Sequence, residues 1–213
     1  MSSAQIGLPK MINETMSDTQ EPSNLLDSDL FEGMTHVPAT RPDTVVTRVL
    51  VMQAKSRLIS MQGMITEATN SAYPSSYTEV MQIDKLLTDT YNNFPPDFRP
   101  KSMAESILDE PGLVMRRCLL ELVYHKLVVN LHRKYLIVGR TDAQYLYSRR
   151  ACLEAALASL QMQDSLDKET QPGGRFSKVS PFAYSKGSLG SSVSWDFFKP
   201  PSHRSFPAQS PTH

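Results

Sequence analysis

Apolar residues recur at steps of three and four along residues 44–70, which is the spacing of one face of an α-helix. The stripe consists of Leu50, Ala54, Leu58, Met61, Ile65 and Ala68. Asp43 or Thr44 can cap the first turn, because a side-chain oxygen there accepts a hydrogen bond from a free backbone N–H. The pattern therefore predicts a first helix over residues 44–70.

The same period returns further along the chain. Its apolar positions are Val80, Ile83, Leu87, Tyr91 and Phe94. Ser76 followed by Glu79 fits a capping box, in which each side chain bonds to the backbone N–H of the other residue. The segment FPPDFRP then ends the helix, because proline lacks the N–H and clashes with the preceding turn. A second helix is predicted over residues 76–93.

Residues 113–136 are apolar on nearly every side, unlike the two segments before them. The apolar positions are Leu119, Leu120, Leu122, Val123, Leu127, Val128, Val129, Leu131 and Leu136. A helix that is apolar all round is buried at the centre of a bundle. Pro111 suits a first turn, acidic Asp109 and Glu110 suit the positive end of the helix dipole, and Gly139 is a candidate terminator. A central helix is predicted over residues 111–137.

A last helix is predicted over residues 148–167, opening at Ser148. Its small residues would allow a neighbouring helix to approach closely; they are Ala151, Ala155, Ala156 and Ala158. The predicted fold class is therefore all-α, with four main helices over residues 44–70, 76–93, 111–137 and 148–167. The helical domain spans residues 44–170.

The two ends of the chain differ from this middle part. Residues 1–43 are net acidic and rich in turn-forming residues, so we expect a loop-rich segment. Residues 171–213 are net basic, and almost half of them are Pro, Ser or Gly. Such a composition buries too little apolar surface to offset ordering, so we expect a disordered tail. The whole chain has 22 basic and 22 acidic residues, without the basic excess typical of a nucleic-acid binder.

One spacing invites a metal-site interpretation. Cys118, His125 and His132 are seven residues apart and share a helix face. Seven residues of helix rise about 10 Å, whereas zinc ligands lie about 2 Å from the ion. Neighbouring members of the stripe cannot hold one ion, so no metal site is predicted.

Enzyme motifs are absent from the sequence. There is no nucleophile elbow, no P-loop and no dinucleotide-binding glycine motif. Two cysteines are too few for a disulfide scaffold or a cysteine zinc site. No stretch approaches the roughly 20 apolar residues of a membrane span. We therefore predict a soluble intracellular protein without catalytic residues, cofactor or membrane contact.

A basic cluster lies around the end of the third predicted helix. HRK is followed by Arg140, Arg149 and Arg150, with tyrosines between them. Apolar neighbours that need burial argue against a DNA-recognition helix. Two roles stay open for Arg133, Arg149 and Arg150: solvated residues at helix ends, or a contact surface for a partner.

Three segments in order resemble a known family. IGLPKMINETMSDTQEPSNLLDSDL resembles G-L-P-R-x-I…D-T-x-x-P-x-N-L-x-D-x-D, and LHRKYL with YSRRACLEAA resembles L-H-R-x-Y-L…Y-S-R-x-x-C-L-x-A-A. TQPGG fits a further short piece. These patterns belong to the fungal-specific transcription factor domain, the middle homology region of fungal binuclear zinc-cluster (Zn2Cys6) transcription factors. The matching residues are Gly7, Pro9, Pro22, Asn24, Asp27, His132, Arg133, Tyr135, Tyr147, Ser148, Arg149, Cys152, Ala155 and Ala156.

The resemblance implies a nuclear transcription-regulatory domain that responds to a co-regulator protein or a small effector. The family binds DNA and zinc through an N-terminal cluster of six cysteines, whereas Cys118 and Cys152 lie elsewhere. We therefore expect an internal fragment of the regulatory domain, with no zinc and no specific nucleic-acid binding of its own. No dimer interface is assigned to it. The alternatives are a stand-alone helical module that binds a ligand or protein, and a non-functional truncated gene product.

Overall fold

A computed structural model describes residues 19–71 and 75–177 of the chain. Four α-helices account for most of them: α1 (Arg48–Asn70), α2 (Tyr77–Asn92), α3 (Pro111–His132) and α4 (Leu146–Thr170). Short 3-10 turns lie between or before them, at Asp27–Asp29, Pro96–Phe98, Arg133–Tyr135, Val138–Arg140 and Ala143–Tyr145. No strand occurs in the described part of the chain. The predicted all-α class with four main helices is confirmed.

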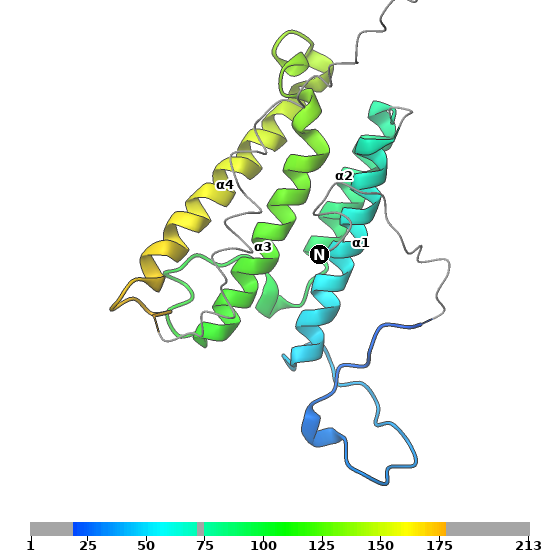
Figure 1. Ribbon diagram of the computed structural model, residues 1–213, viewed down its shortest axis with the longest axis vertical. Coiled ribbons are helices and arrows are strands. Elements are labelled where there is room, and N and C mark those ends of the chain that lie inside the picture. The colour runs from blue at the N-terminus through cyan, green and yellow to red at the C-terminus, as the bar shows by residue number, and fades with distance from the viewer. Residues whose placement is uncertain (1–18, 72–74, 178–213) are drawn as a thin grey trace, which may run out of the picture. The chain divides into compact units, whose positions relative to one another are not determined.

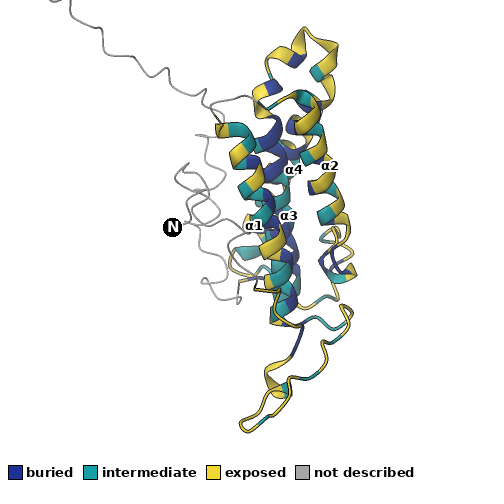
Figure 2. Cartoon of the chain, turned by 90° about the vertical axis from the view of Figure 1, so that its right-hand side faces the viewer, coloured by how far each residue is buried: buried dark blue, intermediate teal, exposed yellow. Residues whose placement is uncertain are grey.

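Helix α3 lies at the centre of the bundle, with α1 and α2 on one side and α4 on the other (Figure 1). It contacts all three other helices, and none of its 22 residues is fully exposed. Figure 2 shows its ribbon as buried or half-buried along its length. The expectation that an all-round apolar segment forms the central helix is confirmed.

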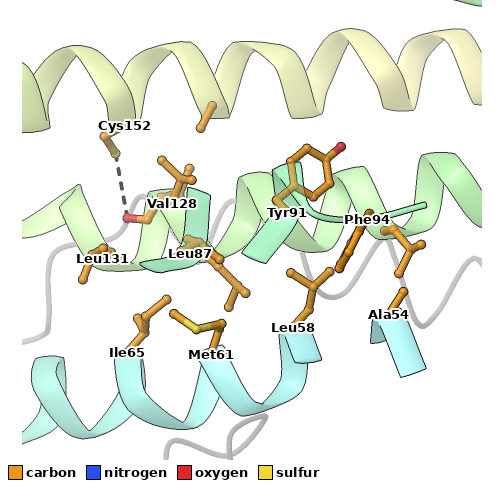
Figure 3. Close-up of a cluster of buried hydrophobic side chains, with 14 of the residues drawn as sticks. Ala54, Leu58, Met61, Ile65, Leu87, Tyr91, Phe94, Val128, Leu131 and Cys152 are labelled. Atoms are coloured by element: carbon orange, nitrogen blue, oxygen red, sulfur yellow. Dashed lines mark hydrogen bonds between the residues drawn. The ribbon is translucent and has the colours of Figure 1, made fainter. Parts of the chain in front are cut away.

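The core contains the apolar stripes that the sequence periodicity indicated. In Figure 3, Leu58, Met61 and Ile65 of α1 face Leu87 of α2 and Leu131 of α3. These side chains are at most 3% exposed. Each apolar face is thus removed from water by its neighbours, which is the main contribution to helix stability in a bundle this size.

The predicted start of α2 is confirmed, whereas the predicted start of α1 is not. The capping box of α2 is present, with the Ser76 side chain accepting from the Glu79 N–H and the Glu79 side chain accepting from the Ser76 N–H. The predicted cap of α1 at Asp43 or Thr44 is wrong. Thr47 is the cap, because its side-chain oxygen accepts the Leu50 N–H at 3.2 Å. The helix begins at Arg48 for that reason.

The end of α3 also differs from the prediction. The α-helix stops at His132 and the chain continues through 3-10 turns, so the predicted extent to residue 137 is too long. Gly139 is not a left-handed terminator, because Gly33 and Gly173 are the glycines with positive φ among the described residues. Gly139 instead permits close packing, since an added Cβ would lie 2.8 Å from the Tyr145 carbonyl oxygen.

The segment after α4 is ordered further than the composition indicated. The backbone turns at Gly173, with φ of +94°, and an added Cβ on Gly174 would overlap the Glu169 carbonyl oxygen. This turn returns Phe176 to the core, where it is 2% exposed. The predicted disordered tail from residue 171 is therefore wrong for residues 171–177. The rest of that prediction, residues 178–213, lies outside the described residues.

Candidate functional site

A buried polar network joins three helices at the end of α3. His132 Nε2 lies 3.0 Å from Asp84 Oδ1 on α2, and His132 Nδ1 lies 2.9 Å from Ser148 Oγ on α4. The Tyr147 hydroxyl donates to Asp84 Oδ2 at 2.6 Å, and Ser148 Oγ donates to the Tyr77 hydroxyl at 3.1 Å. His132 and Ser148 are 0% exposed. Three residues of the predicted family signature thus meet two residues of α2.

The charge of this network rests on Asp84. Burial favours the neutral carboxyl, but the hydrogen bonds from His132 and Tyr147 favour the carboxylate more strongly, and the pKa of Asp84 is lowered from its usual 3.8. The same carboxylate raises the pKa of the Tyr147 hydroxyl, which donates its proton to it. The network therefore holds an ionised Asp84 against its hydrogen-bond donors.

Aspartate, histidine and serine in one chain of hydrogen bonds have the composition of a hydrolase triad. Here the Ser148 oxygen is fully buried and already engaged with His132 and Tyr77, so no substrate can reach it. Burial raises the pKa of the Cys152 thiol to about 11, which keeps that sulfur protonated and unreactive. The arrangement can link helices, but its histidine and serine are closed to solvent.

The position of Asp84 in the sequence carries a signal of its buried role. Asp84 lies four residues after Val80 and three before Leu87, so it falls on the apolar face of α2. A carboxylate on an apolar face needs a buried partner. The partner, His132, lies 48 residues away in the chain, and no local pattern identifies it.

We expect asparagine at position 84 to remove a pH-dependent part of the stability. The folded pKa of Asp84 is below its unfolded value of 3.8, so its contribution is complete above about pH 5 and is lost as the pH falls through the folded pKa. In urea melts, Asp84→Asn should be less stable than the wild type at pH 7, and the difference should shrink below pH 3.8.

The exposed Asp89, on the same helix, provides the matched control. Asp89→Asn should differ little from the wild type at either pH. A stability difference for Asp84→Asn that stays constant between neutral and acid pH would contradict the ionised state of Asp84.

A second polar network orders the segment before α1. The Asn24 side-chain amide donates to the carbonyl oxygens of Arg41, Pro42 and Val45, at 3.2–3.3 Å, and its oxygen accepts from the Thr47 hydroxyl. Asn24 is 1% exposed. The predicted loop-rich segment is thus tied directly to the cap of α1.

Other signature residues of the segment before α1 make fewer contacts or lie outside the described residues. The Pro22 carbonyl accepts a hydrogen bond from the Gln53 side chain at 2.6 Å. Asp27 is exposed, whereas Asp29 binds Arg41 through both carboxylate oxygens and has a pKa lowered to about 2 by that hydrogen bond. Gly7 and Pro9 lie outside the described residues.

The remaining signature residues pack the α3–α4 junction. Tyr135 stacks on Tyr145 with ring centroids 5.0 Å apart. Cys152 and Ala155 are buried against α3, and Ala156 packs at the edge of the same core. The expectation that small residues of the last helix allow close approach is confirmed by this contact.

The helix face with Cys118, His125 and His132 does not have the geometry of a metal site. His132 is engaged in the network above, and His125 lies 3.7 Å from Glu121 on its own helix. Among residues 19–71 and 75–177, no group of three or more His, Cys, Asp or Glu side chains could hold a metal ion. Within the same ranges, no helix is long and apolar enough to cross a membrane.

The predicted contact residues lie on the α3–α4 junction. We call Arg133, Lys134, Arg140, Arg149 and Arg150 the basic surface. Arg133, Lys134 and Arg140 are exposed, and Arg149 is half-buried beside Gly139. Arg150 pairs with Glu154 at 2.6 Å. Exposed Ile137 and Val138 lie between these cations in the chain.

Fold and site together define an all-α domain whose buried polar groups join its helices. Comparison with known proteins gives its family. The sequence is 42% identical over 174 residues to a Zn(2)-C6 fungal-type transcription factor of Macrophomina phaseolina, and 43% identical over 197 residues to one of Monascus ruber. These matches cover 82% and 91% of this chain and 24% of each relative. An equisetin cluster transcription factor of Fusarium heterosporum is 39% identical over 170 residues, 80% of this chain and 24% of that protein.

The chain therefore belongs to the family of fungal Zn(2)-C6 transcription factors, and it spans about a quarter of the length of these relatives. This confirms the resemblance inferred from the three sequence segments. The relatives are transcription factors rather than enzymes, in agreement with the buried Ser148. No family model matches the sequence, and no solved structure matches it.

Proposed function

We propose that this chain is a regulatory region of a nuclear zinc-cluster transcription factor and sets its activity in response to a co-regulator protein or a small effector. The observation that carries the proposal is similarity to transcription factors over 80–91% of the chain, at 39–43% identity. The helical bundle supports it, because its polar networks are internal and its surface is left for contacts. Specific DNA binding is assigned to other parts of such a factor.

The names of three relatives support a proposal for the kind of genes that this chain helps to control. They are called transcription factors of the pyrrolocin, equisetin and fusarisetin A clusters. We propose that the genes controlled through this chain likewise belong to one cluster that produces a small compound. Transcript levels of neighbouring genes, measured after deletion of the gene that encodes this chain, would test that assignment.

The proposed contact site for a co-regulator is the part of the basic surface around Arg133 and Arg140. Arg133 and Arg140 are exposed and have no ion pair among the described residues, so their charges are available to an acidic partner. Ile137, between them in the chain, is 76% exposed and supplies apolar area for such a contact. Combined charge and apolar surface is typical of a protein contact, whereas DNA phosphates need charge alone.

Reversal of the two unpaired arginines should separate regulation from folding. The chain is joined to an unrelated DNA-binding module upstream of a reporter gene, and we expect transcription to change at least severalfold relative to the module alone. Arg133→Glu with Arg140→Glu should lose most of that change, because the partner's acidic groups are then repelled. A urea melt of the same variant should match the wild type.

The control is Lys55→Glu with Lys85→Glu, an equal change of charge at exposed positions on α1 and α2. It should keep the reporter effect. An unchanged reporter with the wild-type chain would count against a regulatory role, and equal losses in both variants would count against this surface. Specific binding of the chain to a target promoter in a gel-shift assay would instead assign these arginines to DNA.

A further inference from the structure

Helix α4 presents a stripe of leucines to the outside of the bundle. The stripe consists of Leu146, Leu153, Leu157 and Leu160, which are between 46% and 56% exposed. The opposite face packs on α3 through small residues, with Ser148, Cys152, Ala155 and Ser159 buried. Figure 1 shows α4 as the outermost helix on its side, with α3 as its neighbour. Four leucines of α4 therefore face away from the core, whereas Leu166, in its last turns, is buried.

Opposite charges lie at the two ends of this stripe. Arg149 and Arg150 belong to its first turns, and Asp164 and Asp167 belong to its last turns. About 15 residues separate the two pairs, or roughly 23 Å of helix. At 100° per residue all four lie along the leucine stripe or beside it. The existing pairs of Arg150 with Glu154 and of Lys168 with Asp164 are exposed, so they contribute little and can be exchanged.

The charges of one α4 complement those of a second α4 when the two helices lie antiparallel. If a second α4 packs antiparallel on the stripe, the basic end of each helix meets the acidic end of the other, and the leucines meet between them. A parallel arrangement would place like charges together. A two-fold antiparallel contact also limits the assembly to two copies, because each copy uses the same patch for the contact.

We propose that α4 is a self-association surface through which two copies of the chain pair antiparallel. The leucine stripe forms the centre, and Arg149 and Arg150 of each copy face Asp164 and Asp167 of the other. This goes beyond the proposed regulatory function by assigning an oligomeric state and its interface. It also gives the outward leucines a partner within the assembly.

Sedimentation equilibrium of the full 213-residue chain tests the proposal. We expect a concentration-dependent dimer. Leu153→Glu with Leu157→Glu should weaken dimerisation at least about tenfold while leaving the helical circular dichroism unchanged, because a dimer cannot bury these carboxylates unpaired. The matched control, Met52→Glu with Ile59→Glu, changes exposed apolar residues of α1 and should keep the dimer.

Charge reversal tests the orientation. Arg149→Glu with Arg150→Glu, and separately Asp164→Lys with Asp167→Lys, should each weaken self-association, whereas an equal mixture of the two variants should form a heterodimer. In a parallel pair neither variant would be weakened, which would overturn the orientation. A wild-type chain that stays monomeric throughout, or whose association is indifferent to Leu153→Glu with Leu157→Glu, would overturn the interface. Neither result bears on the reporter experiment, which uses different residues.

Discussion

His132→Ala is expected to lower the free energy of unfolding by about 3–5 kcal/mol, because it leaves a buried carboxylate and a buried hydroxyl without their hydrogen-bond partner. The substitution leaves the Asp84 carboxylate, 6% exposed, without its contact to Nε2. It also leaves Ser148 without its contact to Nδ1. Urea unfolding at pH 7, followed by circular dichroism, measures the change.

The matched control is His125→Ala, one helical heptad earlier on α3. His125 is half-buried and lies 3.7 Å from Glu121, so its loss should cost less than about 1 kcal/mol. Similar costs for His125→Ala and His132→Ala would mean that the network is not the source of the effect. Retained α-helix content in the His132 variant at low urea would show that the bundle still forms.

Arg117→Met is expected to destabilise the chain by about 3 kcal/mol, because it leaves buried acceptors without their donor. Arg117 is 1% exposed and lies on the all-round apolar α3. Its guanidinium donates to the Asp97 carbonyl at 2.9 Å and to the Ser106 hydroxyl at 3.0 Å. Methionine fills the space of the stem but donates no hydrogen bond.

The neighbouring Arg116 provides the comparison for this variant. Arg116 is half-buried on the same turn of α3, and Arg116→Met should change stability by less than about 0.5 kcal/mol. The two variants remove the same charge, so a difference between them reports on the hydrogen bonds of Arg117, including its ion pair with Asp109 at 2.8 Å. Equal midpoints in urea would contradict that role.

Local patterns predicted the helices well and the joints between them poorly. The period of apolar residues gave α1, α2 and the central position of α3, because the side that faces the core is set by helix geometry alone. The α2 capping box was found because Ser76 and Glu79 are three residues apart. The cap of α1 was missed because Thr47 is selected by its contact with Asn24, 23 residues away.

The candidate site shows the same division. The family segments singled out His132, Tyr147 and Ser148, but they gave neither Asp84 nor Tyr77, which complete the network from α2. Arg117 passed unnoticed, because its buried acceptors, the Asp97 carbonyl and the Ser106 hydroxyl, lie 20 and 11 residues away in the chain. Phe176 was placed in a disordered tail since composition counts many residues, whereas one buried aromatic ring can order a short turn.

By itself the sequence determined the fold class, the order of the helices and the membership in a family of transcription factors. Periodicity acts over one or two helical turns, and the family is identified by motifs in chain order, so neither depends on contacts between distant residues. The tertiary structure decided which face of α4 packs inward, where α3 ends and how Asp84 meets His132. Those outcomes depend on contacts between residues tens of positions apart, since a buried charge or an apolar face is stabilised only by the neighbour that folding brings to it.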